Sequence, residues 1–141
     1  MKKLNRKGFT LVELLAVIVI LAIVVGIALV TVLPTLDKSK EKSFDIAVDA
    51  IRTYIQEQVD LSQLSSDIRG NSYNQAIATC ETECNQATGD ILSVTGYDKN
   101  LSAIQWTTTN GRVTITCATV SAKSDYKQPT VTNNNHVPAC S

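Results

Sequence analysis

The sequence of 141 residues contains a single histidine, His136, in a polar stretch beside three asparagines. A serine or cysteine nucleophile is commonly activated by a histidine base, so any such arrangement would have to use this one residue. The two glycine-rich patterns that bind nucleotide phosphates, GxxxxGK[ST] and GxGxxG, are missing as well. We therefore expect no catalytic residues, no enzyme activity and no cofactor, and we interpret His136 as a solvated loop residue.

Acidic residues are missing from the first eight positions, which hold four basic ones: Lys2, Lys3, Arg6 and Lys7. The whole chain has no net charge, but removing these four from the thirteen basic residues leaves nine against thirteen acidic ones. This balance differs from the basic face of a duplex DNA binder. A binder of single-stranded nucleic acid combines stacking aromatics with a basic groove, and the chain has only a sparse set for it: Trp106, Arg112, Lys123, Tyr126 and Lys127. Nucleic acid is therefore disfavoured as a partner and kept only as a minor alternative.

Charge is also nearly missing from the 25 residues between Phe9 and Leu33, where Glu13 is the only ionisable side chain. This run is long enough to cross a membrane, which takes about 20 apolar residues, and in lipid it must be helical. An ionised side chain in the bilayer costs about 2.5 kcal/mol or more. A secretory signal has an apolar core of only about 7 to 15 residues. A plain anchor fits the length, and the four preceding cations would hold its N-terminus in the cytoplasm, but neither interpretation accounts for Glu13.

Residues 8 to 13, GFTLVE, resemble the processing site of type IV pilins and of their relatives, the type II secretion pseudopilins and the competence pilins. The family pattern is a short basic leader, a glycine, an aromatic residue, three apolar or small residues, a glutamate and a long apolar helix. All of these occur in order: Lys2 to Lys7, Gly8, Phe9, Thr10-Leu11-Val12, Glu13, and Leu14 to Leu33. The resemblance is close over about the first 35 residues and extends to the remainder only as an architecture.

The resemblance implies that a prepilin peptidase cuts between Gly8 and Phe9 and methylates the new amine of Phe9. It also implies that Glu13 neutralises the terminal amine of a neighbouring subunit, which would compensate the cost of burying a charge and set the axial register. Gly26 and Pro34 are candidates for a stretch of helix that loosens on assembly, since proline lacks a backbone donor. The implied partners are further copies in a helical fibre, the membrane before assembly, an assembly platform protein and an ATPase.

After Pro34 the apolar pattern becomes one-sided. Apolar residues recur in steps of 4, 3, 4 and 4 at Phe44, Val48, Ile51, Ile55 and Val59, which is one face of an amphipathic helix. Ala47 and Leu61 or Leu64 extend this face, and the charged residues predicted to point away from it are Asp45, Asp49, Arg52 and Glu57. The pattern predicts one helix from about Phe9 to Leu64, in a helical region that ends at Gly70-Asn71.

The remaining residues predict a small sheet. The segment ILSVTGY, 91–97, is rich in β-forming residues and predicts a strand, while 103–120 consists of two β-rich arms joined by Asn110-Gly111, a strong hairpin signal. Val113, Ile115 and Cys117 share one face, which we expect to meet the helix, and Trp106 is interpreted as core or sheet surface. The predicted fold is α+β and type IV pilin-like, with a long N-terminal helix packed on an antiparallel sheet.

The four cysteines all follow the apolar run. An even number in a small domain outside the membrane indicates two disulfides and an oxidising compartment, and the spacing fits no common zinc pattern. Free thiols in a cytosolic domain are the alternative, and four cysteines allow three connectivities. The resemblance implies Cys117–Cys140, which closes the C-terminal region, and this leaves Cys80–Cys84 as the second bridge. A bridge of this size adds about 3 kcal/mol.

These observations predict a leader at 1–8, a transmembrane and assembly helix at 9–33 and a globular head at 34–141. The head is divided into a helix at 35–65, a loop at 66–90, a sheet at 91–120 and a C-terminal loop at 121–141. The predicted function is that of a structural subunit that polymerises into a type IV pilus. The presence of Glu13 and the small size of the head favour a major pilin. The precursor would cross the cytoplasmic membrane once with its N-terminus inside, and would become extracellular on assembly.

Two alternatives remain. A pseudopilin would belong to a secretion or competence system, and some pseudopilins bind calcium in a late loop, for which the candidate ligands here are Glu81, Glu83, Asp90 and Asp98. An uncleaved, membrane-anchored binding module would keep its first residues and would not assemble. Adhesion, twitching motility, DNA uptake and secretion cannot be distinguished from the sequence.

Overall fold

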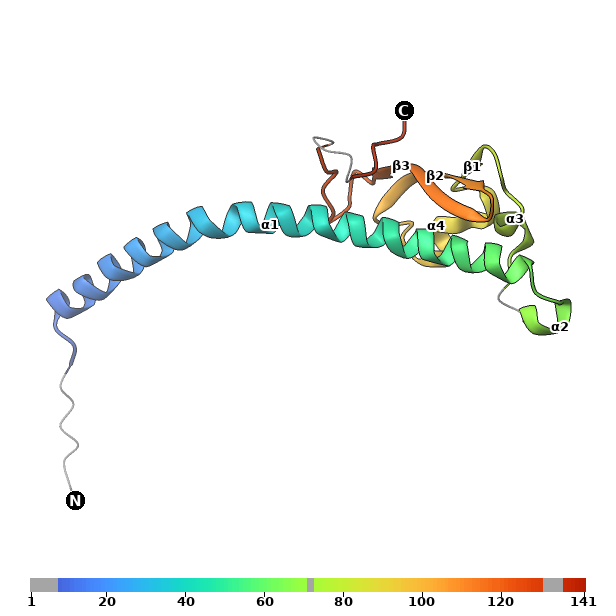
Figure 1. The fold of residues 1–141 in the computed structure, drawn as a ribbon. Coiled ribbons are helices and arrows are strands. Elements are labelled where there is room, and N and C mark those ends of the chain that lie inside the picture. Colours follow the sequence, from blue (N-terminus) through green and yellow to red (C-terminus); the bar gives the residue numbers. More distant parts are fainter. Residues whose placement is uncertain (1–7, 71–72, 131–135) are drawn as a thin grey trace, which may run out of the picture. The chain divides into compact units, whose positions relative to one another are not determined.

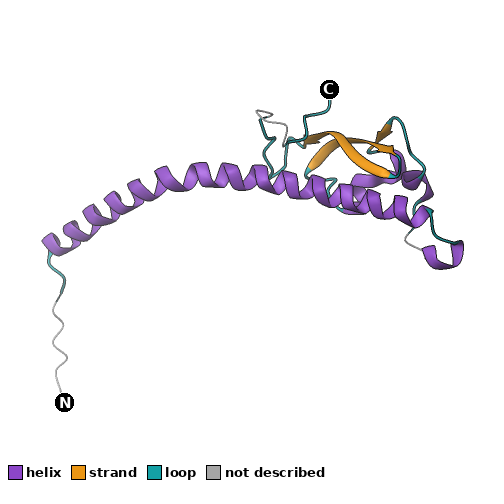
Figure 2. Ribbon diagram, viewed as in Figure 1, coloured by secondary structure: helices purple, strands orange, loops and turns teal. Residues whose placement is uncertain are grey.

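The computed structural model describes residues 8–70, 73–130 and 136–141. The predicted leader cations and Asn71 lie outside these residues. The chain divides into two compact units between Asp37 and Lys38, and each is described by itself. The elements, in chain order, are α1 (Leu11–Ser62), α2 (Ser66–Arg69), α3 (Gln75–Ala78), β1 (Cys84–Asn85), the 3₁₀ turn η1 (Thr88–Asp90), α4 (Ile91–Thr95), β2 (Leu101–Thr109) and β3 (Arg112–Val120) (Figures 1 and 2).

The long helix is confirmed, with bounds two residues inside the predicted ones at each end. Its part in the second unit buries the predicted apolar face: Phe44, Ala47, Val48, Ile51, Ile55 and Val59. The extension of this face is weaker, because Leu64 is 40% exposed. Gln58 was not predicted to be buried but is only 1% exposed, and its Oε1 accepts a hydrogen bond from the Asn74 N–H at 2.7 Å. A buried amide is tolerated here because it binds a main-chain donor.

The predicted strand at 91–97 is wrong, because residues 91–95 form α4. Ile91 and Leu92 are both buried although they are adjacent, which a helix turn packed into the core permits and an alternating strand with one buried face does not. The helix ends at Gly96, with φ of 78°, and the Tyr97 N–H donates to the Leu92 carbonyl at 2.9 Å. This is the glycine-terminated helix end that favours a left-handed residue, so tertiary packing and the cap override local β propensity.

The predicted hairpin is confirmed and forms most of the sheet. Asn110 and Gly111 have φ of 51° and 74°, the two positive values that a type I′ turn requires. The strand order is β1-β2-β3, all antiparallel, and a bulge interrupts the register between the pairs Trp106–Ile115 and Gln105–Cys117. The two-residue strand β1 was not predicted, since the pairing of Cys84 with Trp106 involves too few residues to leave a periodic pattern.

The core of the second unit lies between its part of α1 and the sheet. Trp106, Ile104 and Leu101 of β2 and Val113 and Ile115 of β3 are buried against the apolar face of the helix. Gln56 fastens the hairpin turn to the helix, because its Nε2 donates to the Gly111 carbonyl at 2.8 Å and its Oε1 accepts from the Val113 N–H at 3.0 Å. The predicted contact between this sheet face and the helix is therefore confirmed.

Candidate processing and assembly site

Thr10 caps the start of α1. Its hydroxyl oxygen accepts a hydrogen bond from the Glu13 N–H at 3.2 Å, and its carbonyl accepts from the N–H groups of Glu13 at 3.1 Å and Leu14 at 3.2 Å. Threonine followed three residues later by glutamate is the sequence of a capping box. The role of Thr10 was missed in the sequence, although this four-residue signal could have indicated it. Gly8 and Phe9 therefore lie just outside the helix, and both are exposed.

Glu13 lies in the first turn of α1 and is exposed. No described residue supplies an ion-pair partner to its carboxylate. The helix N-terminus favours a negative charge by about 0.3–1 kcal/mol, so the position suits an ionised acid, but the described part of the chain brings no cation to Glu13. Phe9, four residues earlier, is 85% exposed. The chain thus presents a free carboxylate and the residue of the predicted new amine near one end of an apolar helix.

The apolar surface that follows has no partner within the chain. Helix α1 is long and apolar enough to cross a membrane, with a mean hydropathy of 3.3 over its most apolar window, and none of that window is buried. Leu11, Leu15, Ile18 and Val25 are all more than half exposed. A surface that is apolar on every side must be covered by lipid or by other helices.

Gly26 and Pro34 both lie inside α1, which is helical through both positions. A Cβ added at Gly26 would meet no atom within 4 Å, so glycine is not required here by a close approach. Pro34 removes one backbone donor from the helix. Two threonines nearby bind main-chain carbonyls, Thr31 that of Ala28 and Thr35 that of Thr31, each at 3.0 Å. Loosening of this stretch on assembly stays a prediction.

The cysteines form two disulfides, Cys80–Cys84 and Cys117–Cys140, which is the pairing that the resemblance implies. The tail has further attachments to β3. The Ala118 N–H donates to the Pro138 carbonyl and the Cys140 N–H donates to the Thr119 hydroxyl, both at 2.8 Å. The Val120 N–H donates to Gln128 Oε1 at 2.9 Å. The C-terminal loop is therefore held by main-chain contacts as well as by a covalent bond.

The interpretation of His136 as a solvated loop residue is wrong. Its Nδ1 lies 3.0 Å from Asp45 Oδ1 of α1, and its side chain is 30% exposed. The attachment of the C-terminal loop to β3 brings His136 to α1, which is distant from it in the sequence. Asp45 was predicted to face away from the core, yet it is half-buried by this contact.

The minor alternatives gain no support from the geometry. Trp106 is 1% exposed, so it offers no face on which a base could stack. The four acids proposed for calcium are exposed, and the described residues contain no group of three or more His, Cys, Asp or Glu that could hold a metal.

Residues 3–29 match the family model of the prokaryotic N-terminal methylation motif. No curated protein and no solved structure matches the chain significantly. The matched segment contains Gly8, Phe9 and Glu13, and it supports a type IV pilin-like prepilin with a class III signal peptide. The apolar helix, the three-stranded antiparallel sheet and the two disulfides fit the α+β fold of that class. The match supports a pilin-like or pseudopilin subunit, and the motif implies processing by prepilin peptidase and membrane anchoring before assembly.

Proposed function

We propose that the chain is the major structural subunit of a type IV pilus. The observation that carries this proposal is a carboxylate to which no described residue supplies a partner, Glu13, in the first turn of a helix whose apolar segment is uncovered, within a stretch that matches the methylation motif. The unpaired carboxylate and the uncovered apolar surface are both costly for an isolated subunit in water, and packing against identical subunits removes both costs. In the fibre, residues 9–33 form a central bundle, and the head, 34–141, lies outside.

The proposed steps follow from the chemistry of the N-terminus. Prepilin peptidase removes residues 1–8 on the cytoplasmic side and methylates the amine of Phe9. The cationic amine of one subunit then pairs with Glu13 of its neighbour, which replaces an uncompensated charge by an ion pair. Before assembly the precursor crosses the cytoplasmic membrane once, with its N-terminal cations inside. An assembly platform protein and an ATPase supply the work of extraction.

The two disulfides favour a pilin over a pseudopilin. A structural bridge persists in an oxidising environment, which suits a head that becomes extracellular. A pseudopilin remains the alternative, and an uncleaved anchored module is a second one.

The test is mass spectrometry of intact chains and N-terminal peptides in material sheared from cells. We expect a chain that begins at Phe9, carries one methyl group and lacks four thiol hydrogens. A processed chain that is retained in the cells, with nothing released by shearing, would support the pseudopilin. A chain that still carries its first eight residues would indicate an ordinary membrane anchor and would exclude assembly into a fibre.

A further inference from the structure

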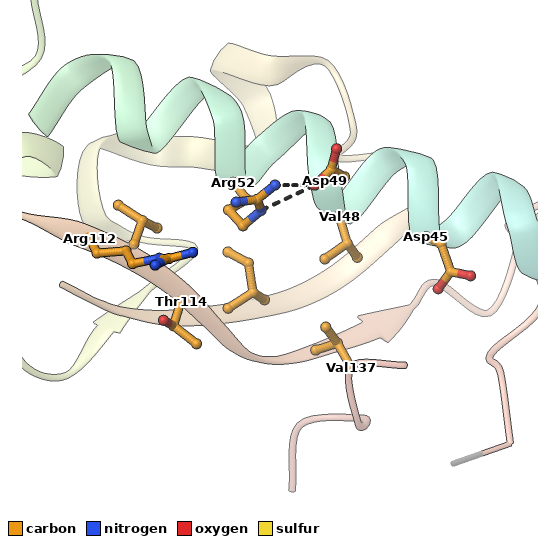
Figure 3. A pocket seen from close by; sticks show the side chains of 9 residues that line it. Asp45, Val48, Asp49, Arg52, Arg112, Thr114 and Val137 are labelled. Carbon is orange, nitrogen blue, oxygen red and sulfur yellow. Dashed lines mark hydrogen bonds and ion pairs between the residues drawn. The ribbon is translucent and has the colours of Figure 1, made fainter. Parts of the chain in front are cut away.

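A groove of about 480 Å³ lies in the second unit between α1 and the outer edge of β3 (Figure 3). Its apolar floor includes Val48, Val113 and Ile115, and Val137 of the tail closes one side. Four charged residues complete the lining: Asp45, Asp49, Arg52 and Arg112. The predicted processing residues, Gly8 and Phe9, do not line this groove.

Three of these four charged residues already have partners. Asp49 pairs with Arg52 on the same helix, as the dashed lines in Figure 3 show, and Asp45 contacts His136. Arg112 is exposed, and no residue of the described chain forms an ion pair with it. The groove therefore has one available charge, a guanidinium, which prefers a carboxylate.

The main chain of β3 also has free groups in this groove. In an antiparallel ladder, residues alternately direct both of their main-chain polar groups towards the partner strand and away from it. The Val113 N–H donates a hydrogen bond to Gln56 Oε1 on the helix, so the main-chain polar groups of Val113 are directed away from β2. Ile115, two residues on and before the bulge, has the same orientation. The Val113 carbonyl and both polar groups of Ile115 thus face outwards, and no described residue outside the sheet binds them.

Both ends of this open edge are closed. Gln56 occupies the hairpin end, and the tail occupies the other end, where the Ala118 N–H donates to the Pro138 carbonyl. Unpaired edges are normally covered because they recruit other strands. At about 3.3 Å per residue, the uncovered length accepts roughly four extended residues.

We propose that this groove binds a short extended peptide of a partner protein by strand addition to β3, with an acidic side chain on Arg112. Main-chain hydrogen bonds to Val113 and Ile115 supply the pairing, and alternate side chains of the peptide contact the apolar floor, as in other cases of β-augmentation. The acidic side chain selects among extended peptides, because Arg112 is the charged residue of the groove to which the described chain supplies no partner.

The test uses the full chain, labelled with ¹⁵N in detergent micelles, and two capped peptides, EVTV and VTVE, which place the acid at either end. We expect one of them to cause saturable shifts of the Ile115 amide and to slow its hydrogen exchange. The same peptide with all its amides methylated keeps its side chains and loses its donors, so it should not bind. Arg112→Gln should weaken binding about fivefold, as expected for a partly exposed ion pair. Lys123→Gln removes the same charge from an exposed position outside the groove lining and should have no effect.

Each remaining outcome overturns the proposal. Absence of saturable shifts at millimolar peptide, or equal binding of the methylated peptide, excludes strand addition. Equal binding by the Arg112→Gln and Lys123→Gln variants excludes recognition of the acid. An Ile115 shift that depends on protein concentration without peptide assigns the groove to a second copy of the chain instead. All of these readouts are independent of fibre formation, so the pilus proposal can fail or succeed separately.

Discussion

Two opposing effects act on the carboxylate of Glu13. The N-terminus of α1 favours its charge by about 0.3–1 kcal/mol, whereas a bilayer disfavours it by about 2.5 kcal/mol or more. The second effect is larger, so an isolated subunit in the membrane carries a net cost that a nearby cation can offset. Pairing with a cation would therefore explain why the apolar run contains one charged residue, Glu13.

Replacing Glu13 with Gln should leave leader removal intact and lower the yield of fibres at least tenfold, because the Phe9 amine of the neighbouring subunit loses its anionic partner while the size of the side chain is kept. The yield is measured by quantifying sheared protein, and processing by N-terminal peptide mass. The control is Glu57→Gln, which removes an exposed acid from the same helix in the second unit. Fibres of normal number in the Glu13 variant would contradict the pairing.

Tyr126 gives the head a dependence on alkaline pH. Burial, followed by the nearby Tyr97 and Asp125, raises its pKa above the ordinary value of 10.0. As the pH rises past 10 the unfolded chain loses this proton before the folded chain does, so the free energy of unfolding falls. We expect Tyr126→Phe to reduce the loss of stability above pH 10 and to leave its pH dependence near neutrality unchanged. Urea unfolding at several pH values measures this, and parallel curves for both proteins above pH 10 would contradict it.

At the scale of elements, long periodic segments could be predicted and short ones could not. The apolar face from Phe44 to Val59 repeats over several helical turns, and Asn110-Gly111 favours a tight hairpin turn. The helix and the hairpin could therefore both be predicted from the sequence. Residues 91–95 have only a few side chains to signal their state, and their β propensity is overridden by burial of Ile91 and Leu92. Gln58 and His136 gain their partners from distant segments, which no local pattern reports.

The Cys117–Cys140 disulfide and the main-chain contacts of the tail can be separated by mutation. Changing both cysteines to Ser should lower the free energy of unfolding by about 3 kcal/mol, against about 2 kcal/mol for the shorter Cys80–Cys84 loop, because a longer closed loop restricts the unfolded chain more. Denaturant unfolding followed by Trp106 fluorescence measures both. The tail should remain partly protected from cleavage at Lys123 and Lys127, since Pro138 and Gln128 still bind β3. Complete loss of protection would mean that the disulfide alone holds the tail.

At the scale of the whole molecule, function and stability are assigned to different units. The residues predicted to act in processing and assembly all lie in the first unit, where the motif in the first 35 residues indicates them. Among the described residues, the buried ones all lie between Phe44 and Pro129, in the second unit. The groove at β3 could not be foreseen, because the pairing state of a strand edge depends on contacts with Gln56 and the tail.

This division predicts that residues 38–141 fold without the first unit. No side chain between Gly8 and Asp37 is buried, so deleting residues 1–37 removes apolar surface that no described core residue uses, and the truncated chain should be soluble in water. Its unfolding midpoint, followed by Trp106 fluorescence, should equal that of the full chain in detergent within a few degrees, which corresponds to less than about 1 kcal/mol for a domain of this size. The matched control adds Phe44→Ala to the truncated chain, which should cost about 3–5 kcal/mol because Phe44 is fully buried. A truncated chain that unfolds without cooperativity would show that the N-terminal half of α1 stabilises the head.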